Sequence, residues 1–182
     1  MLPILKFVPQ FKSVLWGGKR IASYKGLPSQ GENIGESWEL SCVPGHESVV
    51  AEGSLKGKNL HEIMLTDAKE ILGERLLKRY GTEFPLLIKL IDSADDLSIQ
   101  VHPDDTLAAK RHHCPGKTEM WVSIAPADGA YLYSGFNRVI SAEEYRNRIA
   151  DNTIVDTLGK YHPQKGDVFF LPAGRVHSIG KG

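Results

Sequence analysis

The sequence is poor in cysteine and lacks long apolar runs. Its two cysteines, Cys42 and Cys114, do not form a Cys-x-x-Cys pair. One disulfide could join them, but so low a content favours a chain that is kept reduced in the cytosol. No apolar run reaches membrane-spanning length, and the first residues lack both a long apolar stretch and a small-residue cleavage site. We therefore expect a cytoplasmic protein without a signal peptide or membrane contact.

An excess of either charge is also absent. The 22 lysines and arginines equal the 22 aspartates and glutamates, so the formal net charge is zero at pH 7. The sequence thus lacks the basic excess that predicts nucleic-acid binding, and it has no acidic tail. Hydrophobic residues make up 41% of the 182 residues, which is ordinary for a soluble domain with a real core. A neutral chain binds an anionic substrate only through a local cluster of cations.

What the sequence does contain is a series of short strand patterns. Residues 33–43 alternate between apolar and polar side chains, and residues 84–92 form an apolar run with one exception, Lys89. Residues 97–102 read as the next strand. Strands at this spacing favour a closed or double-sheet β architecture. We expect residues 1–182 to form one mainly β domain.

Helical patterns fall in three places. Apolar residues at helical spacing predict two or three short helices within residues 59–80. An aspartate after Pro103 caps a short helix within residues 103–115, and a Ser-x-x-Glu capping box begins a helix near residues 141–150. The sequence ends directly after a strand that looks central, where an interrupted sheet would expose unpaired backbone. We therefore expect this chain to be the N-terminal part of a longer protein.

The most informative segment is Leu-Ser-Ile-Gln-Val-His, residues 97–102. In a strand, Ser98, Gln100 and His102 share one face, and the apolar residues share the other. Polar side chains are costly to bury unless something binds them. One interpretation is a ligand-binding face; the alternative is a strand with one solvated side.

Two further residues favour the ligand-binding interpretation. Glu119 lies in a strand pattern with Lys117 on the same face, and His177 follows a tight turn. Together with Gln100 and His102 they offer one amide oxygen, one carboxylate and two imidazoles, which suits a divalent ion such as zinc. Because only one of these ligands is charged, the site would keep positive charge and could polarise a substrate oxygen.

The spacing of the tail resembles that of a known fold family. Gly166, Pro172 and His177 follow the pattern G-x5-P-x4-H, which resembles the second motif of the cupin β-barrels, where this histidine is a metal ligand. The first cupin motif is only partly present. Its His-x-His is Gln100-x-His102 here, and its glutamate is delayed by the insertion at 103–115.

Longer strings resemble one family within that fold, the type I mannose-6-phosphate isomerases, and the short bacterial form most of all. The strings are WGG (16–18), GESWELS (35–41), LIKLIDSADDLSIQVHPDD (87–105), GKTEMW (116–121) and LPAGRVHSIGKG (171–182). The resemblance implies a cupin-type jelly-roll barrel with helical insertions. It also implies interconversion of mannose 6-phosphate and fructose 6-phosphate through an enediol.

The resemblance further implies one catalytic zinc ion per chain, held by Gln100, His102, Glu119 and His177. Gln100 is the least secure of these ligands, because the short bacterial members can use the other three alone. Full-length members also continue well past the position of Gly182 and contain, in that part, an arginine assigned to catalysis.

Several cations and one hydroxyl are candidates for the chemistry around the metal. Lys117 can reach the same cavity as Glu119, and Lys89 would be desolvated in its apolar strand unless it points inward. The alternative for Lys89 is a lysine that extends to solvent from a strand end. For a substrate phosphate we consider Ser98, Lys117 and Arg175. The residue that moves the proton is not assigned.

Other features have plainer interpretations. His112 and His113 point about 100° apart on a helix and seldom share one ion, so we read them with Cys114 as a solvated helix end. Glu36 and Glu39 could be an acid–base pair, although a hydrogen-bonded strand is the safer reading. Trp38, like Trp16, reads as a packing residue.

Two other functions stay open at this point. One is a sugar-phosphate-binding protein that carries a metal without catalysis. The other is a different cupin enzyme, such as an iron-dependent dioxygenase.

Overall fold

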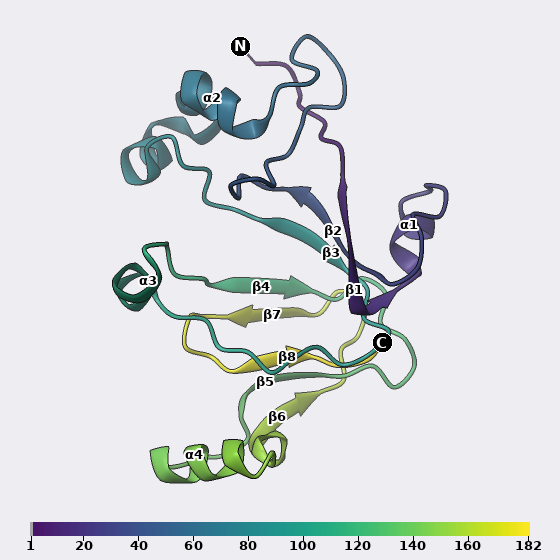
Figure 1. The fold of residues 1–182 in the computed structure, drawn as a ribbon, viewed down its shortest axis with the longest axis vertical. Coiled ribbons are helices and arrows are strands. Elements are labelled where there is room, and N and C mark those ends of the chain that lie inside the picture. The colour runs from purple at the N-terminus through teal and green to yellow at the C-terminus, as the bar shows by residue number, and fades with distance from the viewer. Residues whose placement is uncertain (1) are drawn as a thin grey trace. The chain divides into compact units, whose positions relative to one another are not determined.

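The computed structural model describes residues 2–182 and divides into two compact units, one ending at Asp92 and the other extending from Ser93 to Gly182. The elements of the first unit, labelled in Figure 1, are β1 (Gln10–Gly18), α1 (Arg20–Tyr24), β2 (Ile34–Leu40), α2 (Leu60–Tyr80) and β3 (Ile88–Ile91). Those of the second unit are α3 (Asp105–His112), β4 (Glu119–Val122), β5 (Leu132–Phe136), α4 (Ala142–Ala150), the 3-10 helix η1 (Ile154–Thr157), β6 (Leu158–Tyr161), β7 (Val168–Leu171) and β8 (His177–Ile179).

The described strands pair into three antiparallel sheets. Their orders are β1-β2-β3 in the first unit, and β4-β7 and β6-β5-β8 in the second. Neither unit by itself contains a closed barrel. Helix α2 alone has 21 residues, whereas the longest strand, β1, has nine. The sequence-based prediction of a mainly β chain is therefore not clearly confirmed, because the described elements are a mixture of sheets and helices.

The second glycine of the Trp-Gly-Gly sequence, at the end of β1, is explained by a buried carboxylate. Asp92 is 4% exposed and accepts hydrogen bonds from the backbone N–H of Arg20, at 2.7 Å, and from its Nε, at 2.6 Å. A Cβ atom on Gly18 would lie only 2.0 Å from Oδ2 of Asp92. Only glycine leaves room for the carboxylate, which here satisfies the first backbone donor of α1.

Helix α2 begins with a complete capping box. The Asn59 side chain accepts from the Glu62 N–H at 2.8 Å, and the Glu62 carboxylate accepts from the Asn59 N–H at 2.9 Å. The helix is interrupted at Asp67 and at Gly73, where φ is +70°. These breaks confirm the prediction of two or three short helices rather than one regular one.

The buried face of α2 contributes the core of this unit. Leu60, Met64 and Ala68 form a hydrophobic cluster, and partly buried side chains pack on it, among them Cys42.

The other two predicted helices also begin where the sequence indicated. Asp104 caps α3 by accepting from the Leu107 N–H at 2.8 Å. Ser141 caps α4 by accepting from the Glu144 N–H at 3.0 Å. A short polar side chain at the N-cap satisfies a backbone donor that the helix itself cannot, which is why both starts could be read from the sequence.

The segment 97–102 does not form a regular strand. It lies along β8 through a few backbone hydrogen bonds: Leu97 N–H to the Ile179 carbonyl at 2.9 Å, and a reciprocal pair between Gln100 and His177 at 2.8 and 2.9 Å. The segment lies beside β8 as an extended strand would, but its backbone hydrogen bonds with β8 form an isolated bridge rather than a continuous ladder. This bridge fixes the register between the Gln-x-His segment and β8.

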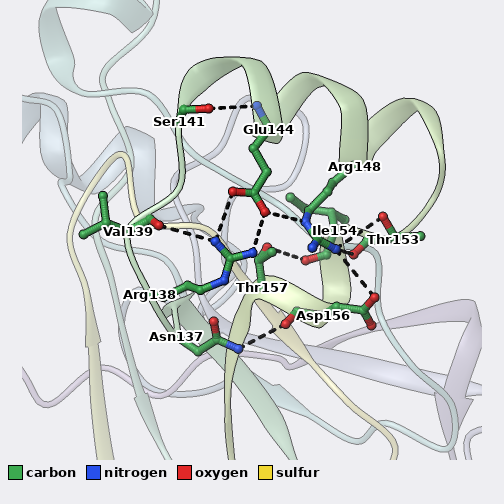
Figure 2. Close-up of polar contacts among 10 residues, drawn as sticks. All are labelled: Asn137, Arg138, Val139, Ser141, Glu144, Arg148, Thr153, Ile154, Asp156 and Thr157. Atoms are coloured by element: carbon green, nitrogen blue, oxygen red, sulfur yellow. Dashed lines mark hydrogen bonds and ion pairs between the residues drawn. The ribbon is translucent and has the colours of Figure 1, made fainter.

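Charged side chains fasten α4 to the segments on either side of it (Figure 2). The Glu144 carboxylate accepts from the Arg138 guanidinium and from Arg148 Nε, the latter at 2.8 Å. Arg148 also donates to the Thr153 carbonyl at 3.2 Å and lies 3.6 Å from the Asp156 carboxylate. The hydrogen bond from Arg138, and that from Arg148, lower the pKa of Glu144 to about 2. The glutamate of the predicted capping box thus binds the two arginines.

No helix in the described part of the chain is both long and apolar enough to cross a membrane. Cys42 and Cys114 are both free thiols, Cys42 partly buried and Cys114 exposed. Burial raises the pKa of the Cys42 thiol, as expected for a small residue packed at a core.

The arginine pair on Glu144 predicts a specific pH dependence of stability. Because the folded-state pKa of Glu144 lies below the ordinary value of 4.5, its contribution is fully present above pH 4.5 and is lost as the pH falls towards about 2. We expect Glu144→Gln to unfold at lower denaturant concentration than the natural protein at pH 7, and the difference to vanish near pH 2. Chemical unfolding at both pH values checks this, with the exposed Glu143→Gln as control. A difference that is independent of pH would contradict the role of the carboxylate charge.

Candidate metal centre

Three side chains of the second unit converge on one point. The potential ligand atoms of His102, Glu119 and His177 all lie within 4.8 Å of one another. His102 Nε2 is 3.4 Å from Glu119 Oε1, and His177 Nε2 is 3.5 Å from Glu119 Oε2. The carboxylate therefore faces both imidazoles, whose ring centroids are 4.9 Å apart.

Backbone hydrogen bonds bring these distant residues together. The Gln100–His177 bridge places the segment that carries His102 beside the start of β8. The His102 carbonyl accepts from the Gly174 N–H at 2.7 Å, which ties the turn between β7 and β8 to the same segment. Glu119 begins β4 and is paired with Leu171 at the end of β7. Each ligand candidate is thus fixed by a neighbouring strand or turn.

The Nε2 atoms of the two histidines are placed where they could bind a metal ion. His102 Nε2 and His177 Nε2 are buried, and neither has a hydrogen-bond partner among the described residues. His177 Nδ1 lies 2.8 Å from the Arg175 carbonyl, which can only accept, so the tautomer that leaves a lone pair on Nε2 is the one that this contact selects for the neutral ring. An unpaired buried nitrogen normally costs about 1–3 kcal/mol. Two of them facing one carboxylate fit a site whose missing partner is a cation.

The charges around the site favour the protonation states that a metal ligand needs. Burial lowers the pKa of His102, and the nearby Lys117 ammonium lowers it further, so the imidazole is neutral at pH 7. Burial by itself raises the pKa of Glu119, but the Lys117 ammonium, 2.9 Å from Oε1, outweighs it and brings this pKa below its ordinary value. A neutral imidazole and an ionised carboxylate bind a divalent ion without first losing a proton.

The alternation of side chains in β4 separates this site from an apolar surface. Glu119 and Trp121 share one face, and the Trp121 ring contacts His177 edge-on, with centroids 5.4 Å apart. Met120 and Val122 lie on the other face and are exposed. The contact of Trp121 with a ligand candidate was missed at the sequence level, although its spacing of two from Glu119 on a strand was the available signal.

The other predicted site residues have different surroundings. The Gln100 side chain donates to Ser98 Oγ at 3.0 Å, so these two polar groups contact each other. The part of Gln100 as a fourth ligand stays a prediction. Arg175 contributes its carbonyl to His177. Lys89 belongs to the first unit, where its ammonium lies 3.0 Å from Glu36 Oε1.

The histidines at the end of α3 form no metal group. His112 is the last residue of the helix, and His113 is its C-cap in a left-handed conformation with φ of +54°. Within residues 2–182, His102, Glu119 and His177 form a cluster of three potential ligands, and no such cluster lies at this helix end.

Comparisons with known proteins agree on one family. The model of "Phosphomannose isomerase type I, catalytic domain" matches residues 4–130. The mannose-6-phosphate isomerase of Streptococcus mutans is 37% identical over 173 residues, which are 95% of this chain and 53% of that protein. Mannose-6-phosphate isomerase ManA of Bacillus subtilis is 35% identical over 179 residues, which are 98% of this chain and 55% of that protein.

A solved structure matches in the same way. The crystal structure of the mannose 6-phosphate isomerase from Bacillus subtilis has a TM-score of 0.88 and 34% identity, and the match covers 98% of this chain and 55% of that chain. The chain thus spans about half the length of the relatives that it matches. The family model includes His102 and Glu119, whereas His177 lies beyond the matched range.

Removal of one imidazole tests the site without any activity measurement. We expect His102→Ala to lower bound zinc from about one ion per chain to near zero, because two remaining ligands hold zinc far more weakly than three. Metal analysis after dialysis checks this, and circular dichroism checks that the variant is folded. His112→Ala, at the exposed end of α3, is the matched control and should keep its metal. Full metal content in His102→Ala would contradict the assignment.

Proposed function

The chain belongs to the type I phosphomannose isomerase family, and we propose that it binds one zinc ion and a sugar phosphate at the site around Glu119. The activity proposed for it is the family's interconversion of mannose 6-phosphate and fructose 6-phosphate. The observation that carries the proposal is the pair of unpaired buried Nε2 atoms, His102 and His177, that face one ionised carboxylate. Two histidines and one glutamate are a ligand set typical of catalytic zinc, with room for a further ligand.

The reaction requires positive charge near the sugar oxygens. A proton moves between C2 and C1, and because a C–H bond beside a carbonyl is only weakly acidic, the oxygen charge that develops must be stabilised. Zinc, when bound, would supply this stabilisation as a Lewis acid. The residues of the chain would hold the ion, position the sugar and keep the ligands in the correct protonation states.

Lys117 is the side chain that we propose to contact the substrate beside the metal. Its ammonium lies 2.9 Å from Glu119 Oε1, and its side chain is 48% exposed, so it can turn a donor towards a bound molecule. One part of its role is electrostatic, because it lowers the pKa of Glu119 and that of His102. The other part is to donate to a sugar oxygen or to the phosphate. We propose Ser98 and Arg175 as further phosphate contacts.

Three other assignments are kept as proposals. Gln100 is proposed as an additional, weaker ligand, since its backbone is bonded to that of His177. Lys89 is proposed as a second catalytic cation. The cupin-type jelly roll is proposed for the whole protein, of which this chain spans about half when measured against its relatives.

A coupled assay tests the proposed function directly. The zinc-loaded chain is expected to convert fructose 6-phosphate to mannose 6-phosphate at a rate that falls with zinc removal and recovers on its addition. Absence of turnover, together with retained zinc and sugar-phosphate affinity, would favour a binding protein. Bound iron and oxygen uptake in place of zinc would favour a different cupin chemistry.

Lys117→Ala separates substrate binding from metal binding. A hydrogen bond to a charged group contributes about 1.5–3 kcal/mol, so we expect kcat/KM to fall about tenfold to a hundredfold. The three ligand side chains are all retained in this variant, so zinc content should stay near one per chain. Steady-state kinetics with metal analysis checks both results, and Lys165→Ala, in the exposed turn before β7, is the control. Unchanged kinetics would remove Lys117 from the site.

A further inference from the structure

In the first unit, one carboxylate holds two different side chains at once. Glu36 Oε1 lies 3.0 Å from the ammonium of Lys89, and Glu36 Oε2 accepts from Trp38 Nε1 at 2.6 Å. The antiparallel register explains the geometry. Trp38 of β2 is directly opposite Lys89 of β3, and Glu36 is two residues before Trp38 on the same face. Each oxygen of the carboxylate therefore has its own partner.

The Trp38 ring completes the surroundings of the Lys89 ammonium. Lys89 Nζ lies over this ring, 5.6 Å from its centroid, within the range of a cation–π contact. Lys12 Nζ lies over the same ring at 4.8 Å and contacts His46 Nδ1 at 3.0 Å. The indole is thus fixed by its N–H on Glu36 and by ammonium groups on its ring. The Trp38 ring, fixed in this way, restricts the conformations that the Lys89 side chain can adopt.

Stability alone is a poor explanation for this arrangement. The side chains of Lys89 and Glu36 are 22% and 16% exposed, and an ion pair this far buried usually contributes no more than an apolar pair of similar size. β3 is otherwise apolar, with Ile88, Leu90 and Ile91 around the lysine. Holding a lysine in one conformation also costs about 2 kcal/mol of rotamer entropy. A group that acts on a substrate gains from such an arrangement, since its position is set before the substrate binds.

We propose that Glu36 is a positioning residue that acts through Lys89. It holds the ammonium of Lys89 at one place, and Trp38 in turn holds the carboxylate of Glu36. The inference rests on the proposed function, in which Lys89 is a second catalytic cation of the sugar-phosphate isomerase. It adds Glu36 and Trp38 to that reaction, although both read at the sequence level as ordinary strand residues.

The first test compares single and double variants. Glu36→Gln keeps the size of the side chain and an acceptor for Trp38 but removes the charge that attracts Lys89. We expect it to lower kcat about tenfold while changing KM about threefold or less, because substrate contacts elsewhere remain. In a Lys89→Ala background the same substitution should have no further effect, since Glu36 acts through Lys89. Effects that multiply in the double variant would overturn the proposal.

Two other variants control for charge and for folding. Glu39→Gln removes a carboxylate from the same strand, where Glu39 pairs with Lys25, and should leave kcat unchanged. Trp38→Phe keeps a ring but loses the N–H that holds Glu36, and should lower kcat in the same direction as Glu36→Gln. This variant also replaces Glu36→Gln if the latter does not fold. Loss of activity in Glu39→Gln equal to that in Glu36→Gln would overturn a specific role for Glu36.

A second measurement does not depend on turnover. Lysines are reductively methylated with 13C, and the Lys89 signal is assigned from its loss in Lys89→Arg. We expect this signal to be separate from those of exposed lysines in the natural protein and to move towards them in Glu36→Gln, but not in Glu39→Gln. If the zinc-loaded chain shows no turnover, the proposed function fails for this chain, and the NMR result alone decides whether Glu36 positions Lys89. A signal that Glu36→Gln leaves unmoved would overturn the positioning role.

Discussion

The proposed site depends on one local arrangement in the second unit, where two buried imidazole nitrogens face one carboxylate. His177 Nδ1 donates to the Arg175 carbonyl, which leaves Nε2 as the ring nitrogen that faces Glu119. Together with Nε2 of His102 it points at Glu119, and neither nitrogen has a hydrogen-bond partner in the described part of the chain. A buried nitrogen without a partner is unfavourable unless a cation or a donor completes it. The surrounding turns, bridges and the Lys117 ammonium all act to keep these three atoms together and in the correct protonation state.

Each of the two units contains a charged side chain that contacts both an opposite charge and an aromatic or imidazole ring. In the second unit, the Lys117 ammonium contacts Glu119 and lowers its pKa beside the imidazoles of His102 and His177. In the first unit, Glu36 holds Lys89 beside an indole. In both cases a partly buried charge contacts an opposite charge and a ring, and we propose that each is thereby positioned for a ligand. Glu144 with its two arginines shows the contrasting case, in which an exposed carboxylate fastens a helix.

Much of the local structure could be predicted because it depends on neighbours in the sequence. The caps at Asp104 and Ser141 need only a short polar side chain before a helical pattern, and both are confirmed. Segment 97–102 was expected as a strand, yet it forms only a bridge to β8, because ladder formation depends on partners far along the chain. Family resemblance named His102, Glu119 and His177, and the structure places their ligand atoms together, while their binding of zinc stays a prediction.

Contacts that depend on register between strands could not be predicted. The Glu36–Lys89 pair requires that β2 and β3 align Trp38 with Lys89, and nothing in either strand alone specifies this. The spacing of Trp121 from Glu119 predicts the face of β4 on which it lies, but its contact with His177 depends on how β4 and β8 approach each other. Closure of a barrel is a property of many strands at once, and neither unit by itself shows it. Sequence reasoning therefore performed best for helix starts and for motifs shared with a family, and worst for side-chain partners across strands.

The most direct measurement is a crystal structure of the zinc-loaded chain with anomalous diffraction recorded above and below the zinc absorption edge. The account predicts one zinc peak at about 2.0–2.2 Å from His102 Nε2, His177 Nε2 and a Glu119 carboxylate oxygen. A zinc peak elsewhere, or an ordered chain with the three side chains turned away from one another, would contradict it.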